Sequence, residues 1–318
     1  MKYIFGPVSS RRLGRSLGID TIPLKTCNWN CVYCQLGRTR PLTNVRREYI
    51  PRQDILAEVK SALMTYKPGQ IDWVTFVGSG EPTLHEGLGW LIKSVRDMTD
   101  LPLAVITNGS LLYLPEVRNQ LAIADAILPS LDAGNSKLYH KINRPWPKLS
   151  FESLLEGLIT FRKEYAGQLW LEVMLVKGLN DTSEALKELA QAIEKIQPDQ
   201  VHLMLPDRPP AESWVQLPDE SGLQRVRETL RKVADLVFPA YRSSASCSQD
   251  ELESAIMGII TRHPMQEAEL CDLLSDWPLE IVQDTLGTLR SQGKAQLIVR
   301  YNERFWCAAG AFYAVAEI

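Results

Sequence analysis

Short apolar runs alternate with amphipathic segments along the first two thirds of the chain. Six runs have the composition of buried strands, namely residues 16–22, 71–77, 103–107, 126–131, 169–176 and 201–205. Apolar residues at helical spacing occupy residues 52–66, 115–121, 136–142, 151–165, 182–196 and 222–237. Strands that alternate with helices form a parallel sheet with right-handed crossovers. The pattern therefore predicts an α/β fold with a curved (βα)6 sheet, two units short of a full barrel.

The last part of the chain has a different pattern. Three short helices are expected at residues 252–261, 267–274 and 279–290, followed by a hairpin of residues 295–299 and 305–308. This order resembles a winged-helix domain. A polar stretch at 246–250 marks the boundary, so two domains are predicted, a catalytic domain of residues 1–245 and a winged-helix-like domain of residues 246–318.

Charge separates the same two parts. The chain has a net charge of −3, but residues 250–318 hold 11 acidic and 5 basic residues, a net of −6, and residues 1–249 hold 27 acidic and 30 basic residues, a net of +3. Winged-helix domains often bind DNA through their third helix. Here that helix, at residues 279–290, carries the acidic residues Glu280 and Asp284. Because DNA affinity depends on Lys and Arg, we expect poor DNA binding. We expect the small domain to dock on the catalytic domain or to bind a protein or peptide partner.

The composition indicates a soluble protein of the cytoplasm. Hydrophobic residues make up 45% of the chain, which is typical of a globular protein. The sequence shows no signal peptide and no apolar run of the roughly 18 residues that cross a bilayer. Six cysteines in such a chain favour metal binding over disulfides.

Three of those cysteines, Cys27, Cys31 and Cys34, are spaced by four and then three residues, with Tyr33 directly before the last. A loop with this spacing can direct three thiolates at three irons of a [4Fe–4S] cluster, leaving the fourth iron open for a small molecule. A zinc site with three ligands and a group of buried thiols are the alternatives. Cys271 and Cys307 are expected in the core of the small domain, and Cys247 in the linker.

Polar and glycine residues follow the ends of the predicted strands. The run Gly78, Ser79, Gly80, Glu81 follows residues 71–77, and glycines there let the backbone approach a ligand closely. Glu81 could accept a hydrogen bond from an ammonium group. Asn108, Ser130, Asp132 and Arg208 follow later strands. Because ligands bind at the carboxyl ends of parallel strands, we expect these residues around one site.

Together the two motifs resemble the signature of the radical S-adenosylmethionine (radical SAM) superfamily, over residues 16–215. The resemblance implies that Cys27, Cys31 and Cys34 bind three irons of a [4Fe–4S] cluster, while SAM chelates the fourth iron. It implies reductive cleavage of SAM to a 5′-deoxyadenosyl radical that abstracts hydrogen from a substrate. It also implies a reducing partner of the flavodoxin or ferredoxin type. The SAM contacts it implies are Tyr33, Gly78, Ser79, Gly80, Glu81, Asn108, Ser130 and Asp132.

The substrate is less well indicated. Residues 130–133, 141–145 and 175–180 are similar to the tRNA-modifying demethylwyosine synthase, but a second cysteine cluster is missing and the charge is not that of an obvious tRNA binder. The Gly-Glu-Pro-Thr run also resembles the activases of glycyl-radical enzymes, which act on a protein backbone. The chain as a whole resembles radical SAM proteins known only as Fe–S oxidoreductases. A non-catalytic Fe–S electron carrier or partner-binding protein is the alternative of another class.

Three further basic features have two interpretations each. Lys177 could form a Schiff base with a carbonyl substrate, although a solvated turn is the favoured interpretation. Arg208 could anchor an anionic substrate or brace its proline-rich loop. Arg11, Arg12 and Arg15 form a basic loop that is either solvated or holds an anion near the cluster.

Overall fold

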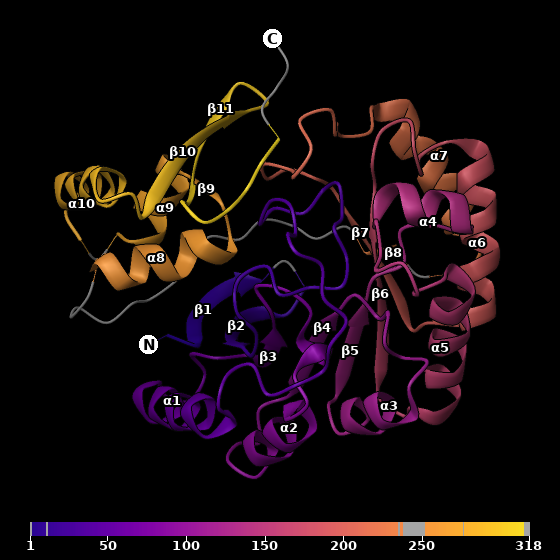
Figure 1. Ribbon diagram of the computed structural model, residues 1–318, viewed down its shortest axis with the longest axis horizontal. Coiled ribbons are helices and arrows are strands. Elements are labelled where there is room, and N and C mark those ends of the chain that lie inside the picture. The colour runs from indigo at the N-terminus through magenta and orange to yellow at the C-terminus, as the bar shows by residue number, and fades with distance from the viewer. Residues whose placement is uncertain (1, 11, 235, 238–251, 276, 315–318) are drawn as a thin grey trace.

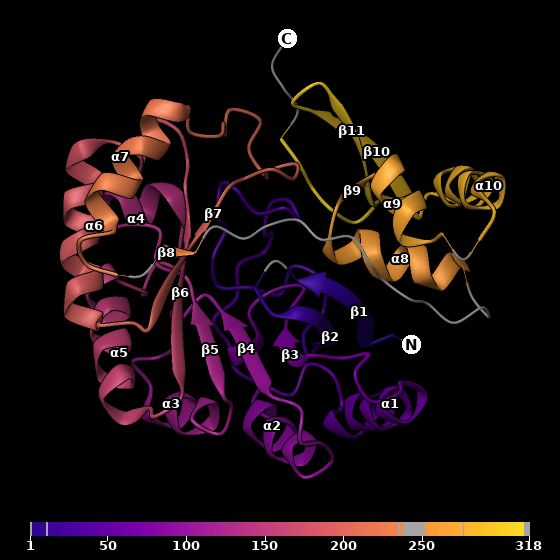
Figure 2. The ribbon, with the colours of Figure 1, turned by 180° about the vertical axis from the view of Figure 1, so that it is seen from behind.

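The computed structural model describes residues 2–10, 12–234, 236–237, 252–275 and 277–314. Its main feature is a curved sheet in which the strands follow one another in chain order (Figures 1 and 2). The strands are β1 (Ile4–Ser10), β2 (Gly14–Asp20), β3 (Trp73–Val77), β4 (Leu103–Thr107), β5 (Ala126–Pro129), β6 (Gln168–Met174), β7 (Gln200–Met204) and β8 (Leu236–Val237). From β2 to β8 neighbouring strands are parallel, which confirms the predicted α/β class.

Helices cover the outer face of the sheet (Figure 1). They are α1 (Arg52–Thr65), the 3-10 turn η1 (Pro82–Leu84), α2 (Leu88–Arg96), α3 (Pro115–Leu121), α4 (Ser136–Ile142), α5 (Phe151–Glu164), α6 (Ser183–Ile196) and α7 (Glu220–Leu230). One apolar cluster fills the space between sheet and helices and includes Phe76, Leu158 and Phe161, all fully buried. The helices therefore bury one face of each strand, and the strand ends are left to form a site.

The amino-terminal strand β1 corrects the sequence prediction. The sequence pattern predicts no strand before residues 16–22, but Ile4–Ser10 pairs antiparallel with β2. The sequence pattern did not predict this strand because Gly6 and Pro7 are residue types that are rare in strand interiors. An edge strand tolerates a proline, since its outward N–H group needs no partner. Arg15 forms an exposed ion pair with Asp72, with 2.8 Å between Nη2 and Oδ1, and Arg11 lies outside the described residues.

The other edge of the sheet also differs from the prediction. The helix expected over residues 222–237 ends at Leu230, and Leu236–Val237 forms β8 beside β7. The helical spacing continues through Val233, but residues 231–233 form a turn instead. Among the described residues the sheet thus has eight strands where the sequence pattern predicted six, with the seven-residue β1 added at one edge and the two-residue β8 at the other.

The last part of the chain has its own apolar core. It contains α8 (Leu252–Arg262), β9 (Met265–Gln266), α9 (Glu267–Leu273), α10 (Leu279–Ser291), β10 (Ala295–Arg300) and β11 (Glu303–Ala308). The three helices and the hairpin agree with the sequence pattern, and β9 adds a third strand in the order β10-β11-β9. Cys307 is buried and Cys271 packs at the edge of this core. The predicted boundary at 245/246, and Cys247, lie outside the described residues.

The small carboxyl-terminal unit contacts the edge of the large sheet. In Figures 1 and 2 its helix α8 lies beside β1. Among the described residues, none of the helices has the length and apolar character needed to span a bilayer.

Candidate active site

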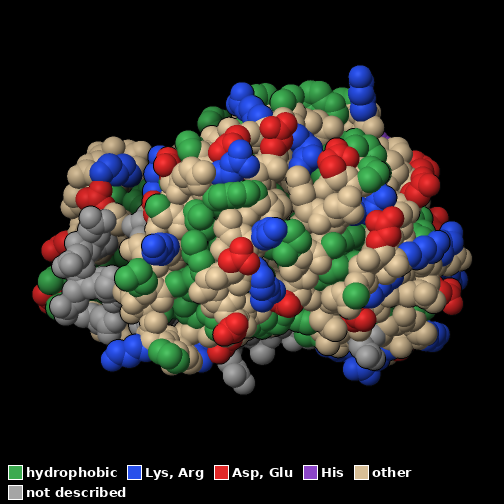
Figure 3. Space-filling model, turned by 90° about the horizontal axis from the view of Figure 1, so that it is seen from below, with side chains coloured by type: hydrophobic (Ala, Val, Ile, Leu, Met, Phe, Trp, Pro, Cys, Tyr) green, Lys and Arg blue, Asp and Glu red, His purple; other side chains and the backbone are tan. Residues whose placement is uncertain are grey.

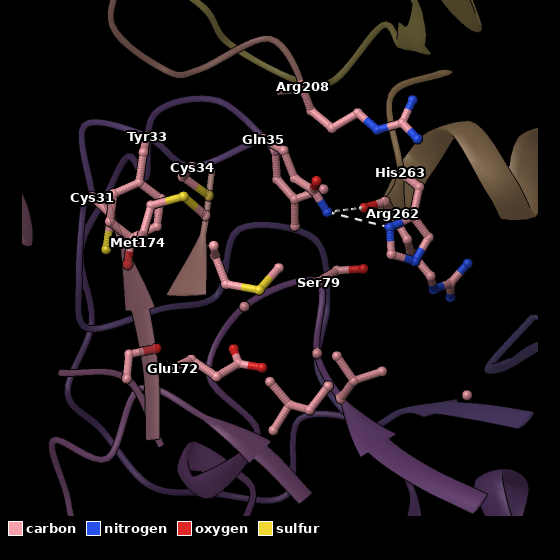
Figure 4. A pocket seen from close by; sticks show the side chains of 18 of the residues that line it. Cys31, Tyr33, Cys34, Gln35, Ser79, Glu172, Met174, Arg208, Arg262 and His263 are labelled. Carbon is pink, nitrogen blue, oxygen red and sulfur yellow. Dashed lines mark hydrogen bonds between the residues drawn. The ribbon is translucent and has the colours of Figure 1, made fainter. Parts of the chain in front are cut away.

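A cavity of about 490 Å³ lies between the carboxyl ends of the strands and helices α8 and α9. Its lining includes most of the residues that the sequence motifs single out: Cys27, Cys31, Tyr33, Cys34, Gly78, Ser79, Gly80, Glu81, Asn108, Ser130 and Arg208. In Figure 4, Cys31, Tyr33 and Cys34 lie on one side, and Arg208, Arg262 and His263 on the other. Residues from six distant parts of the chain thus meet in one volume.

The three cysteines lie on the long loop that follows β2. Each sulfur is within reach of a polar donor from outside the motif: Asn108 Nδ2 at 3.8 Å from Cys27 Sγ, Asn143 Nδ2 at 3.7 Å from Cys31 Sγ, and Lys25 Nζ at 3.1 Å from Cys34 Sγ. Donors of this kind stabilise thiolate charge and tune the potential of an iron–sulfur group. The surroundings of the loop are therefore suited to bound thiolates.

Burial, in contrast, disfavours the thiolate form of the same cysteines. Desolvation, aided by nearby negative groups, raises the pKa of Cys27 to about 12 and raises that of Cys31. A bound metal would displace the protons of such thiols to solvent, because its positive charge compensates the thiolates. Among the described residues, no three His, Cys, Asp or Glu side chains are placed to hold one metal ion together. The three ligands of a [4Fe–4S] cluster bind three different irons. They therefore need not converge on one metal ion and need only face the same cavity. The donor set fits a [4Fe–4S] cluster.

The loop after β3 is joined to the cysteine loop by its backbone. Lys25 N–H donates to Ser79 O at 2.6 Å, and Glu81 N–H donates to Thr26 O at 2.9 Å. Gly80 lies between these bonds, where a Cβ atom would come within 1.9 Å of the Thr26 carbonyl oxygen. The glycine is required because the residue that precedes the first cysteine packs directly on it.

Glu81 is a buried carboxylate with several donors. Its Oε1 accepts hydrogen bonds from Thr83 and Thr107, both at 2.6 Å from the hydroxyl, and its Oε2 accepts one from Asn108 N–H at 2.7 Å. Burial nevertheless raises its pKa, and the hydrogen bonds only partly oppose this. A cationic ligand in the cavity would stabilise the ionised form. The site thus fits the ammonium group of an amino acid.

Asp132 has a supporting position. It is 2% exposed and is not part of the cavity lining. Its Oδ2 accepts hydrogen bonds from Tyr33 Oη at 2.5 Å and Asn143 Nδ2 at 2.6 Å, and its Oδ1 accepts one from Met174 N–H at 2.8 Å. Both oxygens are already bonded, so Asp132 holds Tyr33 and Asn143, two neighbours of the cysteines, in place.

A third buried carboxylate, Asp20, was missed in the sequence. Asp20 ends β2, and its oxygens accept hydrogen bonds from Ser79 N–H at 3.0 Å and Ser79 Oγ at 2.5 Å. Arg262 of α8 pairs with the same carboxylate, with 2.9 Å between Nε and Oδ2. An acidic residue at a strand end was the only local signal. Its partner lies 242 residues away, so no local pattern could reveal the pair.

The cysteine loop also touches the small carboxyl-terminal unit directly. Gln35, next to Cys34, donates from Nε2 to the Arg262 carbonyl oxygen at 2.9 Å (Figure 4). Tyr313 Oη donates to Gln35 O at 2.7 Å, and Arg38 N–H donates to Phe312 O at 2.6 Å. The unit therefore forms one wall of the site.

The remaining charged candidates are paired. Arg208 forms an ion pair with Glu269 of α9, which joins its loop to the small unit. Arg12 of the amino-terminal segment pairs with Glu172 in the cavity. Lys177 lies outside the cavity lining, in an exposed pair with Asp219 at 3.3 Å. These contacts fit the turn interpretation of Lys177 and the bracing interpretation of Arg208.

The fold and the site define a class of protein, and comparison with known families gives the same class. Residues 21–193 match the model of the radical SAM superfamily. The chain belongs to this superfamily, whose members use a [4Fe–4S] cluster and SAM. Within it, the chain belongs with the UPF0026 proteins. It is 34% identical to the UPF0026 protein MJ1312 of Methanocaldococcus jannaschii over 298 residues, which cover 92% of each chain.

Two further proteins are similar to this chain over a smaller part of their own length. A protein named GTPase Obg from Brachyspira hyodysenteriae is 47% identical over 207 residues, which are 65% of this chain and 30% of that protein. A radical SAM methyltransferase from Sphaerobacter thermophilus is similar in structure, with a TM-score of 0.50 and 19% identity over 72% of this chain and 67% of the other. This second similarity concerns the fold alone.

We expect Gly80→Ala to disturb the cysteine loop. A Cβ that meets the Thr26 carbonyl oxygen should lower the free energy of unfolding by roughly 1–3 kcal/mol, as overpacking does, and should reduce the iron bound after reconstitution. Thermal unfolding and iron analysis measure both. Gly258→Ala is the control, because a Cβ there meets nothing within 4 Å. Equal iron content in both variants would contradict the packing argument.

We expect Arg262→Ala to destabilise the loop that contains Ser79. The substitution leaves the buried Asp20 carboxylate without its cation, at a cost of about 3 kcal/mol. Hydrogen exchange at the Ser79 amide should become faster. The control is Lys294→Ala, which removes an exposed pair with Glu253 and should change stability by less than about 1 kcal/mol. Unchanged exchange at Ser79 would show that Arg262 does not act through Asp20.

Proposed function

We propose that this protein cleaves SAM reductively and directs the resulting radical at a substrate bound in the cavity between the strand ends and α8–α9. One observation carries the proposal: Cys27, Cys31 and Cys34 line the same cavity as the Gly78–Glu81 run. When bound, the [4Fe–4S] cluster supplies the electron that splits SAM into methionine and a 5′-deoxyadenosyl radical, which takes hydrogen from the substrate.

The cluster would be held by three cysteine ligands and by the hydrogen-bond donors around them. Cys27, Cys31 and Cys34 would bind three irons, and the donors from Asn108, Asn143 and Lys25 lie at their sulfurs. These donors would hold negative charge at the sulfurs. Both asparagine amides also bond other side chains, Asn28 and Asp132, so they are fixed in orientation before any ligand arrives.

SAM would lie against the carboxyl ends of β3, β4 and β5. Glu81 would accept hydrogen bonds from its ammonium group, and Gly78, Ser79 and Gly80 would allow close approach of the backbone. Tyr33, held by Asp132, would pack on the adenine. Ser130 lines the cavity at the end of β5 and would face the ribose or the carboxylate. Asp132 would act by orienting Tyr33, because it is not part of the cavity lining, whereas Glu81 is.

The substrate would enter between the large sheet and the small unit. On one side the wall is apolar, with Met174 and Met204, and on the other it contains Ile259 and Leu273. Apolar walls would limit the water that reaches a reactive radical. The charges at its edge are paired, Arg12 with Glu172 and Arg208 with Glu269. Arg208 thus serves mainly to close the gap between the two walls.

The small unit would be a winged-helix-like domain that serves the catalytic domain. The order helix, strand, helix, helix and hairpin supports this, as does the contact of Arg262 with Asp20. Its expected third helix, α10, exposes Leu279 and Ile281, each about half accessible, beside acidic Glu280 and Asp284. This surface is better suited to a protein or peptide than to DNA.

The reaction class is tested by an anaerobic assay of the reconstituted, reduced protein with SAM. The wild type should release 5′-deoxyadenosine, and Cys34→Ala should release none, because one iron loses its ligand. Parallel samples with total tRNA or with a cell peptide extract would report which substrate class stimulates the reaction.

Cys271→Ala is the matched control. Cys271 lies on α9 outside the cavity lining, so its loss should leave nucleoside release unchanged. A fully loaded, reduced wild type that forms no 5′-deoxyadenosine would contradict the proposal and favour an Fe–S electron carrier.

A further inference from the structure

A second hollow of about 380 Å³ lies on the outer side of the cysteine loop. We call it the basic groove. Its lining includes Lys25, Thr26, Arg40, Thr43, Arg47 and Tyr49, and it holds three cations and no carboxylate. Lys25 is the only residue that it shares with the lining of the large cavity, among the residues that the structure describes.

The positive charge of the basic groove is not compensated locally. Residues 24–52 contain six basic residues and one acidic residue. Three of the arginines are paired, Arg38 with Glu212, Arg46 with Glu116 and Arg52 with Glu48. Within the described ranges, Lys25, Arg40 and Arg47 form no ion pair with a carboxylate. The ammonium group of Lys25 is directed at Cys34 Sγ, so the charge exposed in the groove comes from Arg40 and Arg47.

By contrast with the groove, one face of the molecule carries charges of both signs. On the face seen from below, basic and acidic side chains are interspersed over the surface (Figure 3). In the groove, Arg40 and Arg47 are exposed, and Arg47 stacks on the Tyr49 ring with 4.5 Å between guanidinium carbon and ring centre. A surface of one sign with an aromatic platform is suited to an acidic macromolecule.

The floor of the groove is in contact with the cluster ligands. Lys25 Nζ lies 3.1 Å from Cys34 Sγ and donates to Gly37 O at 2.6 Å. Thr43 N–H donates to Cys27 O at 3.1 Å. Lys25 has a φ of +62°, a backbone conformation that is uncommon for residues with a side chain. Only one layer of chain thus separates the groove from two of the ligating cysteines.

The position of the basic groove favours an electron donor over a substrate as the molecule that binds there. SAM and substrate would fill the large cavity, so an electron must reach the cysteines from another side. The groove provides such a side, and its floor touches Cys27 and Cys34. An RNA substrate bound in the groove would have its bases on the outer side of the loop, away from the cavity where the radical would form.

We propose that the basic groove docks an acidic electron-carrier protein, with Arg40 and Arg47 as its main charge contacts. The inference rests on the proposed function. One electron passes from the carrier, which is oxidised, to the iron–sulfur group beneath the groove, which is reduced, and no bond forms or breaks. Electrostatic complementarity of this kind speeds association and weakens with salt.

The test uses the cluster-loaded protein and a purified acidic flavodoxin as the probe. Arg40→Glu together with Arg47→Glu should weaken flavodoxin binding by about tenfold or more at low salt, because two attractions become repulsions. The binding constant is measured by calorimetry, and reduction by reduced flavodoxin should slow in parallel. Arg40→Lys together with Arg47→Lys keeps the charge and should restore most of the binding.

The matched control carries the same charge change elsewhere. Arg231→Glu with Lys232→Glu alters two exposed residues after α7 and should change binding by less than about twofold. Iron content and circular dichroism confirm that each variant is folded and loaded. Wild-type binding in the groove variant would overturn the proposal. So would unchanged flavodoxin reduction combined with a loss of tRNA binding.

Dithionite separates the two proposals. This small reductant needs no docking surface, so it should reduce the groove variant as fast as the wild type, with equal release of 5′-deoxyadenosine. If dithionite-reduced wild type releases no nucleoside, the proposed function fails whatever the flavodoxin data show. If the nucleoside forms in both proteins and flavodoxin does not discriminate between them, only the docking proposal fails.

Discussion

The site depends on two backbone hydrogen bonds that join the cysteine loop to the loop after β3. Lys25 N–H bonds Ser79 O, Glu81 N–H bonds Thr26 O, and Gly80 lies between them without a side chain. The loop that holds the cysteines has no helix or strand of its own between β2 and α1. A loop of this length keeps a defined shape only if its polar backbone groups find partners elsewhere. The two motifs are therefore one structure, and the glycine motif supports the cysteine loop as well as lining the cavity.

Two buried carboxylates extend this support away from the loops. Asp132 binds Tyr33 and Asn143, and Asp20 binds Ser79 and Arg262. A buried carboxylate is stable only when donors surround it, so each one fixes the groups that satisfy it. Through Arg262 the fixed network reaches the small unit. Docking of that unit and the position of Ser79 are thus coupled by one carboxylate.

The sequence predicted the features that are encoded locally. The spacing of Cys27, Cys31 and Cys34, and the glycines after β3, are local patterns, and the strand–helix alternation places both at one edge of the sheet. It missed β1, because Gly6 and Pro7 disfavour a strand except at an edge, and edge position is a property of the whole sheet. It missed the role of Asp20 for a similar reason. A pair between residues 20 and 262 depends on how two units pack, and no periodicity records that.

Charge gives the cysteine loop two different faces. Its inner face lines a cavity in which Arg12 and Arg208 are both neutralised by glutamates, so that face attracts no large charged body. On its outer face Arg40 and Arg47 form no ion pair, although the neighbouring Arg38, Arg46 and Arg52 are paired. The outer face therefore presents a net positive charge that the inner face lacks. Under the proposed function, the inner face of the loop would meet SAM and the substrate, and the outer face would meet the electron carrier, one layer of chain away.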